Sequence, residues 1–399
     1  MTGAENAAPG KNGRMEHGAL RTGSFPAGKR DVGVYIHIPF CVHKCAYCDF
    51  PSWAGREDYM AAYTDALCRE IGARAPRDAR ADTVYIGGGT PSVLPAALME
   101  RVIGTLRAHM DIAPDAEMSC EMNPGTVTED FAACMRQGGF NRVSMGMQAA
   151  QDRLLRALDR VHTAADVAAS TDILRRVGFE NLNLDLMLGL PGQTVRDVEE
   201  SLDFALSLPL TPSHMSCYGL IVEPETRLAA WLDEGKMTLP DGEAERDMYE
   251  ICRERLAREG IFQYEISNFA RPGYACRHNV NVWRRREYIG FGCGACGMMD
   301  NVRRTNPRRL SDYLRGAPPE TESISPGDAR FESVMLGLRL TEGISAADFQ
   351  TMHGVSLEEA FGKKWKKPVR EGLLTWDGEY LKLTRRGMDV QNRVLVDLM

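Results

Sequence analysis

The sequence predicts an α/β fold built on about six parallel strands joined by helices. Six strand-like runs occur in the first 220 residues, namely "VGVYIHI", "DTVYIGG", "AEMSCEM", "NRVSMGM", "NLNLDLMLGL" and "SHMSCYGL". Stretches of helical periodicity follow most of them, such as "EDFAACMRQGG" and "AADVAASTDILRRVGF". Repeated strand–helix units predict right-handed crossovers between parallel strands. We interpret the strands as apolar on both faces, as expected when helices cover them. An open doubly wound sheet and a partial barrel both satisfy this pattern.

Polar and glycine-rich signals fall where these strands end. A cysteine-rich loop follows the first run, "GGGTP" (87–91) ends the second, and Glu121 ends the third. Gln148 closes the fourth run, and Asp185 lies in the fifth, which ends in "GLPGQT". Because the carboxyl ends of parallel strands share one rim of a barrel, we expect these residues to gather there.

The alternation stops at about residue 240. An amphipathic helix, "EAERDMYEICRERLAREGI", precedes an irregular segment that contains "HNVNVW" and "IGFGCGACG". Two helices and a hairpin around Asp377-Gly378 then suggest a small winged-helix-like module. We therefore predict four parts: a disordered N-terminal extension (1–30), the strand–helix domain (31–235), an α/β extension (236–320) and the winged-helix-like C-terminal domain (321–399).

The composition limits the class of protein. The chain has 399 residues, 44% of them hydrophobic, and a net charge of −7, which argues against nucleic acid or an anionic membrane as a partner. No apolar run approaches the roughly 20 residues of a membrane span. The first thirty residues lack the apolar region of a secretory signal. Eleven cysteines without an export signal indicate reduced thiols and a cytoplasmic protein.

Three cysteines lie within eight residues of "YIHIPFCVHKCAYCDF" (35–50). Cys41, Cys45 and Cys48 follow a C-x3-C-x2-C spacing. Packing in the hydrophobic core does not explain three cysteines in one loop flanked by Pro39, His43 and Lys44. A disulfide is disfavoured because the cytoplasm keeps thiols reduced. A structural zinc site usually has four ligands, for which only distant cysteines such as Cys276 and Cys293 are available. A four-iron cluster held by three thiolates leaves one iron open to a small molecule, and this explains the absence of a fourth cysteine.

Other residues of the rim are candidate ligands. The glycines of "GGGTP" would let a ligand approach the backbone closely, although a tight turn explains them equally well. Glu121 could accept hydrogen bonds from hydroxyl or ammonium groups, or act as an acid at a helix N-terminus. Arg160 could pair with a carboxylate, or be a solvated helix residue. Asp185 lies inside an apolar strand, where a carboxylate is costly unless it is paired. "GLPGQT" could be a turn capped by Thr194.

The cysteine spacing, with Tyr47 just before the last cysteine, resembles the radical S-adenosylmethionine (SAM) superfamily. The resemblance implies a [4Fe–4S] cluster whose open iron holds the amino and carboxylate groups of SAM. It also implies a partial, about six-stranded β/α barrel of radical SAM type.

Longer segments resemble the coproporphyrinogen dehydrogenase-like group, among them "YIGGGTPSVL", "EMNPGT", "NLDLMLGLPGQT" and "YIGFGCGACG". Its dehydrogenases (HemN) carry a further cysteine two residues after the third, whereas its heme chaperones (HemW) carry an aromatic residue, as Phe50 is here. The segment His278–Trp283, "HNVNVW", resembles the HNxxYW element of the chaperones, with Val282 in place of Tyr.

The resemblance implies a set of site residues. The SAM contacts of the group correspond to Tyr35, Gly88, Gly89, Thr90, Glu121, Gln148, Arg160 and Asp185. His278 is implied as a heme ligand, and Cys296 stands where the chaperones usually have His. A thiolate is itself an axial heme ligand in some proteins, while a small residue in a glycine turn explains Cys296 equally well. Arg284, Arg285 and Arg286 could meet heme propionates or form a solvated face.

The expected function is heme binding and delivery to apo-proteins such as membrane respiratory subunits, with a cellular electron donor for the cluster. One alternative is the oxygen-independent coproporphyrinogen III dehydrogenase, which decarboxylates two propionates to vinyl groups. Another is a radical SAM methyltransferase of the same architecture.

Overall fold

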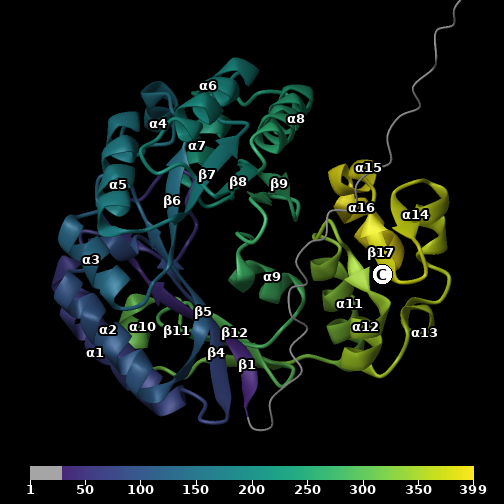
Figure 1. The fold of residues 1–399 in the computed structure, drawn as a ribbon, viewed down its shortest axis with the longest axis horizontal. Coiled ribbons are helices and arrows are strands. Elements are labelled where there is room, and N and C mark those ends of the chain that lie inside the picture. Colours follow the sequence, from purple (N-terminus) through teal and green to yellow (C-terminus); the bar gives the residue numbers. More distant parts are fainter. Residues whose placement is uncertain (1–28) are drawn as a thin grey trace, which may run out of the picture.

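The computed structural model describes residues 29–399, so the extension predicted for residues 1–30 lies almost wholly outside the described residues. An open sheet of twelve strands forms the main body (Figure 1). Its centre is the predicted set of six neighbouring parallel strands: β1 (Arg30–Ile38), β4 (Ala79–Gly88), β5 (Asp111–Met122), β6 (Arg142–Gln148), β7 (Asn181–Leu188) and β8 (His214–Gly219). The six-stranded parallel arrangement is thus confirmed, in a sheet that is open rather than closed.

Helices cover the convex side of this curved sheet (Figure 1). They are α1 (Met60–Arg74), α2 (Ala96–His109), α3 (Glu129–Gln137), α4 (Asp152–Ala157), α5 (Ala164–Val177), α6 (Val195–Leu206), α7 (Arg227–Asp233) and α8 (Gly242–Arg258). Apolar strand residues such as Val34, Ile86 and Leu184 are fully buried in one continuous core with α1, α2, α3, α5, α6 and α8, whereas the leucines of α4 belong to a smaller separate cluster. Removing this apolar surface from water holds the helices to the sheet.

The prediction that the strands are apolar on both faces is wrong. In β5, Glu117, Ser119 and Glu121 alternate with the core residues Met118 and Cys120. The register pairs Ser119 with a tyrosine of β4 and an arginine of β6, so the polar residues of neighbouring strands share one face. That face is the concave one, which no layer of helices covers, and it is free to carry polar groups.

The segment predicted as irregular contains regular elements. α9 (Arg277–Trp283) lies on the concave side of the sheet (Figure 1). β11 (Tyr288–Phe291) adds a seventh parallel strand beside β1, and the antiparallel strands β12 (Cys296–Met299), β13 (Val302–Thr305) and β14 (Glu320–Ser323) follow at that edge. β10 (Asn268–Ala270) and β9 (Phe262–Gln263) extend the opposite edge.

Glycine hides the strand pattern of this segment. A Cβ atom on Gly290 would lie 2.2 Å from the carbonyl oxygen of Cys296, so β11 and β12 approach more closely than a side chain allows. The glycines required for that approach removed the alternation that would have identified the strands. The short helix α10 (Leu310–Leu314) follows β13.

The C-terminal residues form a second core. Their elements are α11 (Pro326–Gly337), β15 (Ile344–Ser345), α12 (Ala346–His353), α13 (Leu357–Phe361), α14 (Lys366–Arg370), β16 (Leu374–Trp376), β17 (Tyr380–Leu383), α15 (Arg385–Asp389) and α16 (Gln391–Leu398). β16 and β17 form the predicted hairpin, and Gly378 in its turn has a φ of 95°. The sheet order is β15-β17-β16. The winged-helix-like topology and the domain boundaries stay predictions.

None of the helices within residues 29–399 is both long and apolar enough to cross a membrane.

Candidate functional site

The cysteine loop is fixed to the body of the protein by backbone hydrogen bonds on two sides. It runs between β2 (Phe40–Cys41) and β3 (Trp53–Ala54), which pair with each other. The amide of Ala46 donates to the carbonyl oxygen of Leu158 (3.0 Å), and the Ala46 carbonyl oxygen accepts from the amide of Leu228 (3.0 Å). The loop therefore has a defined position without help from a disulfide.

The three thiols of this loop lie near one another. Cys41 is buried and Cys45 and Cys48 are half-buried. Burial raises the pKa of Cys41 and of Cys48, and each of these pKa values is raised further by the neighbouring thiol of Cys45. An iron–sulfur cluster takes its cysteines as thiolates, so binding a cluster here would displace protons from these thiols. Among the described residues no three His, Cys, Asp or Glu side chains, these three cysteines included, are close enough together to hold a single metal ion.

The "GGGTP" turn packs directly against the cysteine segment. The amide of Gly89 donates to Ile38 (2.8 Å) and that of Thr90 to Phe40 (2.7 Å), while the Thr90 hydroxyl donates to Cys41 Sγ (3.6 Å). A Cβ atom on Gly88, whose φ is 115°, would lie 2.4 Å from the imidazole of His37. Gly88 is therefore required because a side chain at this position would collide with His37. The sequence alone did not reveal this reason for the glycine.

Glu121 is the centre of a buried group at the ends of β1, β4 and β5. Its carboxylate accepts hydrogen bonds from the Tyr85 hydroxyl (2.9 Å) and the Gly88 amide (2.9 Å). Burial raises the pKa of Glu121, although these two hydrogen bonds oppose the shift. Tyr35 stacks on Tyr85 with 6.3 Å between the ring centroids. Glu121 is therefore a strand-end residue and not an acid at a helix N-terminus.

Arg160 does not lie on a helix, because it follows α4 in a loop where Asp159 has a φ of 57°. Its guanidinium is half-buried and lies against the cysteine loop. It donates to five acceptors: the Tyr47 hydroxyl (2.9 Å), Asn123 Oδ1 (3.0 Å), the Gly146 carbonyl oxygen (3.0 Å), His162 Nδ1 (3.2 Å) and Cys45 Sγ (3.7 Å). The interpretation as a solvated helix residue is thus wrong.

Gln148 and Asp185 complete the same wall. Gln148 ends β6 with a φ of 64°, a conformation that few residues other than glycine adopt. The turn buries its side chain, whose oxygen accepts from the Tyr218 hydroxyl (3.3 Å). Asp185 Oδ1 accepts from Asn183 Nδ2 (2.7 Å), and burial raises the pKa of Asp185. The carboxylate of Asp185 thus has a hydrogen-bond partner, as expected for a carboxylate within a largely apolar strand.

Sequence reasoning missed Asn123, which joins Arg160 to the hydroxyl of Thr90 (2.7 Å). It stands two residues after Glu121 at the same strand end, so the rule that singled out Glu121 could have found it. Glu117 and Arg142 were missed as well. Like Asp185, they are charged residues within a strand, and that signal was present in the sequence. Nε and Nη1 of the buried Arg142 have no hydrogen-bond partner within residues 29–399.

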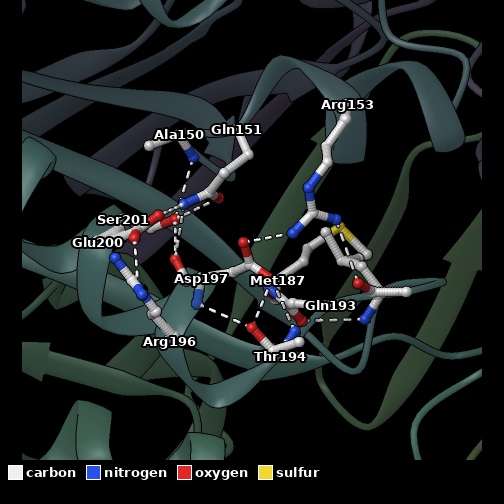
Figure 2. A network of polar contacts seen from close by, with 12 residues as sticks. Ala150, Gln151, Arg153, Met187, Gln193, Thr194, Arg196, Asp197, Glu200 and Ser201 are labelled. Carbon is white, nitrogen blue, oxygen red and sulfur yellow. Dashed lines mark hydrogen bonds and ion pairs between the residues drawn. The ribbon is translucent and has the colours of Figure 1, made fainter.

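"GLPGQT" is a structural turn, as its alternative interpretation held. Figure 2 shows Gln193 between the Leu190 amide (3.0 Å) and the Met187 carbonyl oxygen (3.0 Å). Thr194 caps α6 in a reciprocal capping box with Asp197. These bonds hold α6 against β7 and engage the side chains of both Gln193 and Thr194 within the protein.

The predicted heme residues lie at the open side of the sheet. His278, on α9, is buried, and its Nδ1 contacts the Thr83 hydroxyl (3.0 Å) while its ring stacks on Tyr85 (5.3 Å). Burial lowers the pKa of His278 to about 4, so the imidazole is neutral near pH 7. Cys296 is half-buried in β12, and its Sγ accepts from the Thr305 hydroxyl (3.6 Å).

The basic run beside α9 binds carboxylates of the C-terminal elements. Arg285 pairs with Glu332 (2.9 Å), and Arg284 pairs with Glu342. Arg339 pairs with Glu265 (3.0 Å) and lies over the Trp283 ring, 4.4 Å from its centroid. Two arginines expected to meet propionates therefore hold the C-terminal elements to the rest of the chain.

The residues expected to bind SAM lie at the same strand ends as the cysteine loop, whereas the expected heme residues His278 and Cys296 lie elsewhere. A small pocket opens among them, and it is lined by Cys45, Thr90, Asn123, Arg160 and His162 together with neighbouring loop residues. It offers two features to a small molecule: hydrogen-bonding groups on its walls and the thiol of Cys45. All eleven cysteines lie within the described residues and are free thiols.

Comparisons with known proteins agree with this arrangement. Residues 35–205 match the family model of the radical SAM superfamily, and residues 324–390 match the HemN C-terminal domain. Curated relatives include three proteins named heme chaperone HemW. The one from Synechocystis sp. is 39% identical and the alignment covers 80% of each chain. The one from Bacillus subtilis is 36% identical, and the alignment covers 90% of this chain and 97% of the relative. The one from Escherichia coli is 34% identical, and the alignment covers 91% of this chain and 97% of the relative.

A solved structure shares the fold. It is the coproporphyrinogen III oxidase HemN from Escherichia coli, with a TM-score of 0.80 at 23% identity, covering 93% of this chain and 90% of that chain.

Proposed function

Because the chain belongs to the heme chaperone HemW family of the radical SAM superfamily, we propose that it binds heme and delivers it to apo-proteins. The observation that carries this proposal is the match to the chaperones over 97% of the length of two of them. The aromatic Phe50, in place of the further cysteine of the dehydrogenases, supports the same branch.

We infer that Cys41, Cys45 and Cys48 hold a [4Fe–4S] cluster and that SAM binds beside it. When bound together, these two groups supply one-electron cleavage of the sulfonium bond, which yields methionine and a 5′-deoxyadenosyl radical. The fit rests on three thiols of one loop that lie close enough to influence one another's pKa, and on a neighbouring pocket lined by Cys45 that contains both acceptor and donor groups.

The residues of the rim have distinct chemical tasks in this proposal. Arg160 places a fixed positive charge 3.7 Å from Cys45 Sγ and can pair with a carboxylate beside the cluster. Glu121 and Asp185 are buried carboxylates with raised pKa values, and both are suited to hydrogen bonds with hydroxyl or ammonium groups of a ligand. The half-buried Tyr35, Gly88 and Gly89 and the buried Gln148 shape the wall.

His278 and Cys296 are the heme ligands that we propose from the family pattern. His278 is neutral near pH 7, the state in which an imidazole binds a metal. Its burial means that heme ligation would require α9 to move from its position on Thr83 and Tyr85. We further propose a cytoplasmic location, a cellular electron donor for the cluster, and membrane respiratory subunits among the acceptors.

Two other functions are compatible with the same cofactors. The likeness to HemN shows the fold alone and does not assign dehydrogenase activity to this chain. The anaerobic assay described next includes dehydrogenase activity as one of its outcomes. A methyltransferase would need a second SAM as methyl donor, and no feature of the described residues favours it.

The test uses the reconstituted full-length protein under anaerobic conditions. We expect it to retain one heme per chain and to release this heme to an apo-protein, while SAM, a strong reductant and coproporphyrinogen III yield no protoporphyrinogen IX. Mass spectrometry would follow 5′-deoxyadenosine and the porphyrinogens together. Coupled formation of 5′-deoxyadenosine and protoporphyrinogen IX would overturn the chaperone proposal in favour of the dehydrogenase.

A further inference from the structure

A second hollow lies outside the cysteine site. It has a volume of about 290 Å³ and lies between α1, α10 and the residues that follow β13. Its polar lining includes Arg69, Glu70, Arg74 and Arg304. None of the residues assigned above to the cluster, SAM or heme belongs to this lining.

The only carboxylate in the lining is already saturated. Glu70 accepts from the Gly292 amide (2.9 Å), Asn306 Nδ2 (2.8 Å) and the Tyr313 hydroxyl (2.8 Å), and it also pairs with Arg74. One carboxylate with these four donors balances the charge of Arg74 and has no capacity left for a second guanidinium.

Two guanidinium groups in this cleft remain without a partner. Arg304 Nε is buried and has no hydrogen-bond partner, and neither Arg69 nor Arg304 forms an ion pair within residues 29–399. Burial lowers the pKa of Arg74, and the nearby charge of Arg304 lowers it further. Positive charges that repel one another at the wall of a cleft would be stabilised by a bound anion. The arginines beside α9 differ, since carboxylates already neutralise them.

The remaining walls are apolar. Ala66, Leu314, Pro318 and Pro319 line the cleft together with the ring of Tyr313. We propose that this cleft binds an organic anion that carries carboxylate or phosphate groups on an apolar body. Arg69 and Arg304 contact the oxyanion in this assignment, and the proline-rich wall packs against the body. The binding site stands whether or not the protein carries heme.

Two sources could supply this chemistry, namely a propionate of a tetrapyrrole and a phosphate of a nucleotide. Isothermal titration calorimetry of the full-length protein would use three probes: metal-free mesoporphyrin IX, its dimethyl ester and ADP. Mesoporphyrin lacks iron, so axial ligation cannot contribute to its binding. We expect one of the two anions to bind and the uncharged ester not to bind at the cleft.

The decisive variant is Arg69→Gln/Arg304→Gln. Loss of two charge-assisted hydrogen-bonding groups should weaken the bound anion about 100-fold. The matched control is Arg196→Gln/Arg258→Gln, which removes two exposed arginines outside the cleft and should bind as the wild type does. Binding by mesoporphyrin alone would identify a propionate as the ligand, and binding by ADP alone a phosphate.

Two results would overturn the proposal. One is that neither anion binds the wild type at concentrations up to about 1 mM, a free energy of only about −4 kcal/mol. The other is that the double variant binds the anion as tightly as the control does. If the double variant does not fold, Arg69→Gln alone carries the same test, because Arg69 is exposed and its loss removes no internal contact.

Discussion

Replacing Arg160 by methionine should separate the binding role of this residue from its structural role. Its guanidinium donates to Tyr47, Asn123 and Gly146 at 2.9–3.0 Å, and it lies 3.7 Å from Cys45 Sγ. Methionine keeps most of the apolar volume and removes every donor. We therefore expect two measurable losses, one in stability and one in the affinity for SAM.

The structural loss follows from the acceptors left unpaired. A buried acceptor without its donor costs about 1–3 kcal/mol, and because the group is half-buried we expect about 3 kcal/mol for the three oxygen acceptors and His162 Nδ1 together. The binding loss follows from the missing carboxylate partner, which is worth about 3 kcal/mol, or roughly a factor of 100 in Kd. Urea unfolding of the apo-protein would give the first value, and anaerobic calorimetry with SAM on the reconstituted protein the second.

Arg156→Met is the matched control, since Arg156 is an exposed residue of α4 in the same region of the chain. It should change the stability by less than about 0.5 kcal/mol and leave the affinity for SAM unchanged. Wild-type affinity for SAM in Arg160→Met, together with lower stability, would refute the binding role and leave Arg160 as a structural support of the cysteine loop.

Two further predictions concern the cluster and the response to acid. Replacing any one of Cys41, Cys45 or Cys48 by Ala should abolish the brown absorption of the reconstituted cluster, whereas Cys134→Ala should retain it; normal absorption in a loop variant would contradict the assignment. Burial lowers the pKa values of His37, His162 and His278 to about 4, so the unfolded chain binds more protons than the folded one between pH 6.5 and 4. The free energy of unfolding of the apo-protein should therefore fall by about 2 kcal/mol per histidine from pH 6.5 to 5. The raised pKa values of Glu121 and Asp185 oppose this trend, and a urea midpoint independent of pH in this range would contradict the buried neutral histidines.

The features that local pattern controls could be predicted from the sequence. Strand–helix alternation gave the parallel sheet, and the convergence of strand ends placed Glu121, Gln148 and Asp185 on one rim with the cysteines. The polar concave face was also encoded, as the alternation of Glu117, Ser119 and Glu121 shows. β7 shows the same period, because Asn181, Asn183 and Asp185 alternate with leucines. The prediction overlooked this alternation because it weighed the apolar content of the strands and not the period of their polar residues.

Features that depend on the path of a loop could not be predicted. Arg160 reaches Cys45, 115 residues earlier, because Asp159 turns the chain in a left-handed conformation after α4. A single sequence gives no sign of that turn, and its helical context suggested solvent exposure. The glycines of "GGGTP" are a similar case, since the neighbours that exclude a side chain, His37 and Phe40, belong to another strand and to the cysteine segment.

The position of His278 limits what its replacement can show about heme. Its ring stacks on Tyr85, the Tyr85 hydroxyl donates to Glu121, and Glu121 accepts from the amide of Gly88 beside the cysteine loop. These contacts link α9 to the proposed SAM wall through only two side chains. His278→Ala removes one of the two rings that stack on Tyr85, the other being Tyr35, so it can shift Glu121 even where heme never contacts the imidazole. Loss of heme by this variant therefore indicates ligation only if its affinity for SAM equals that of the wild type.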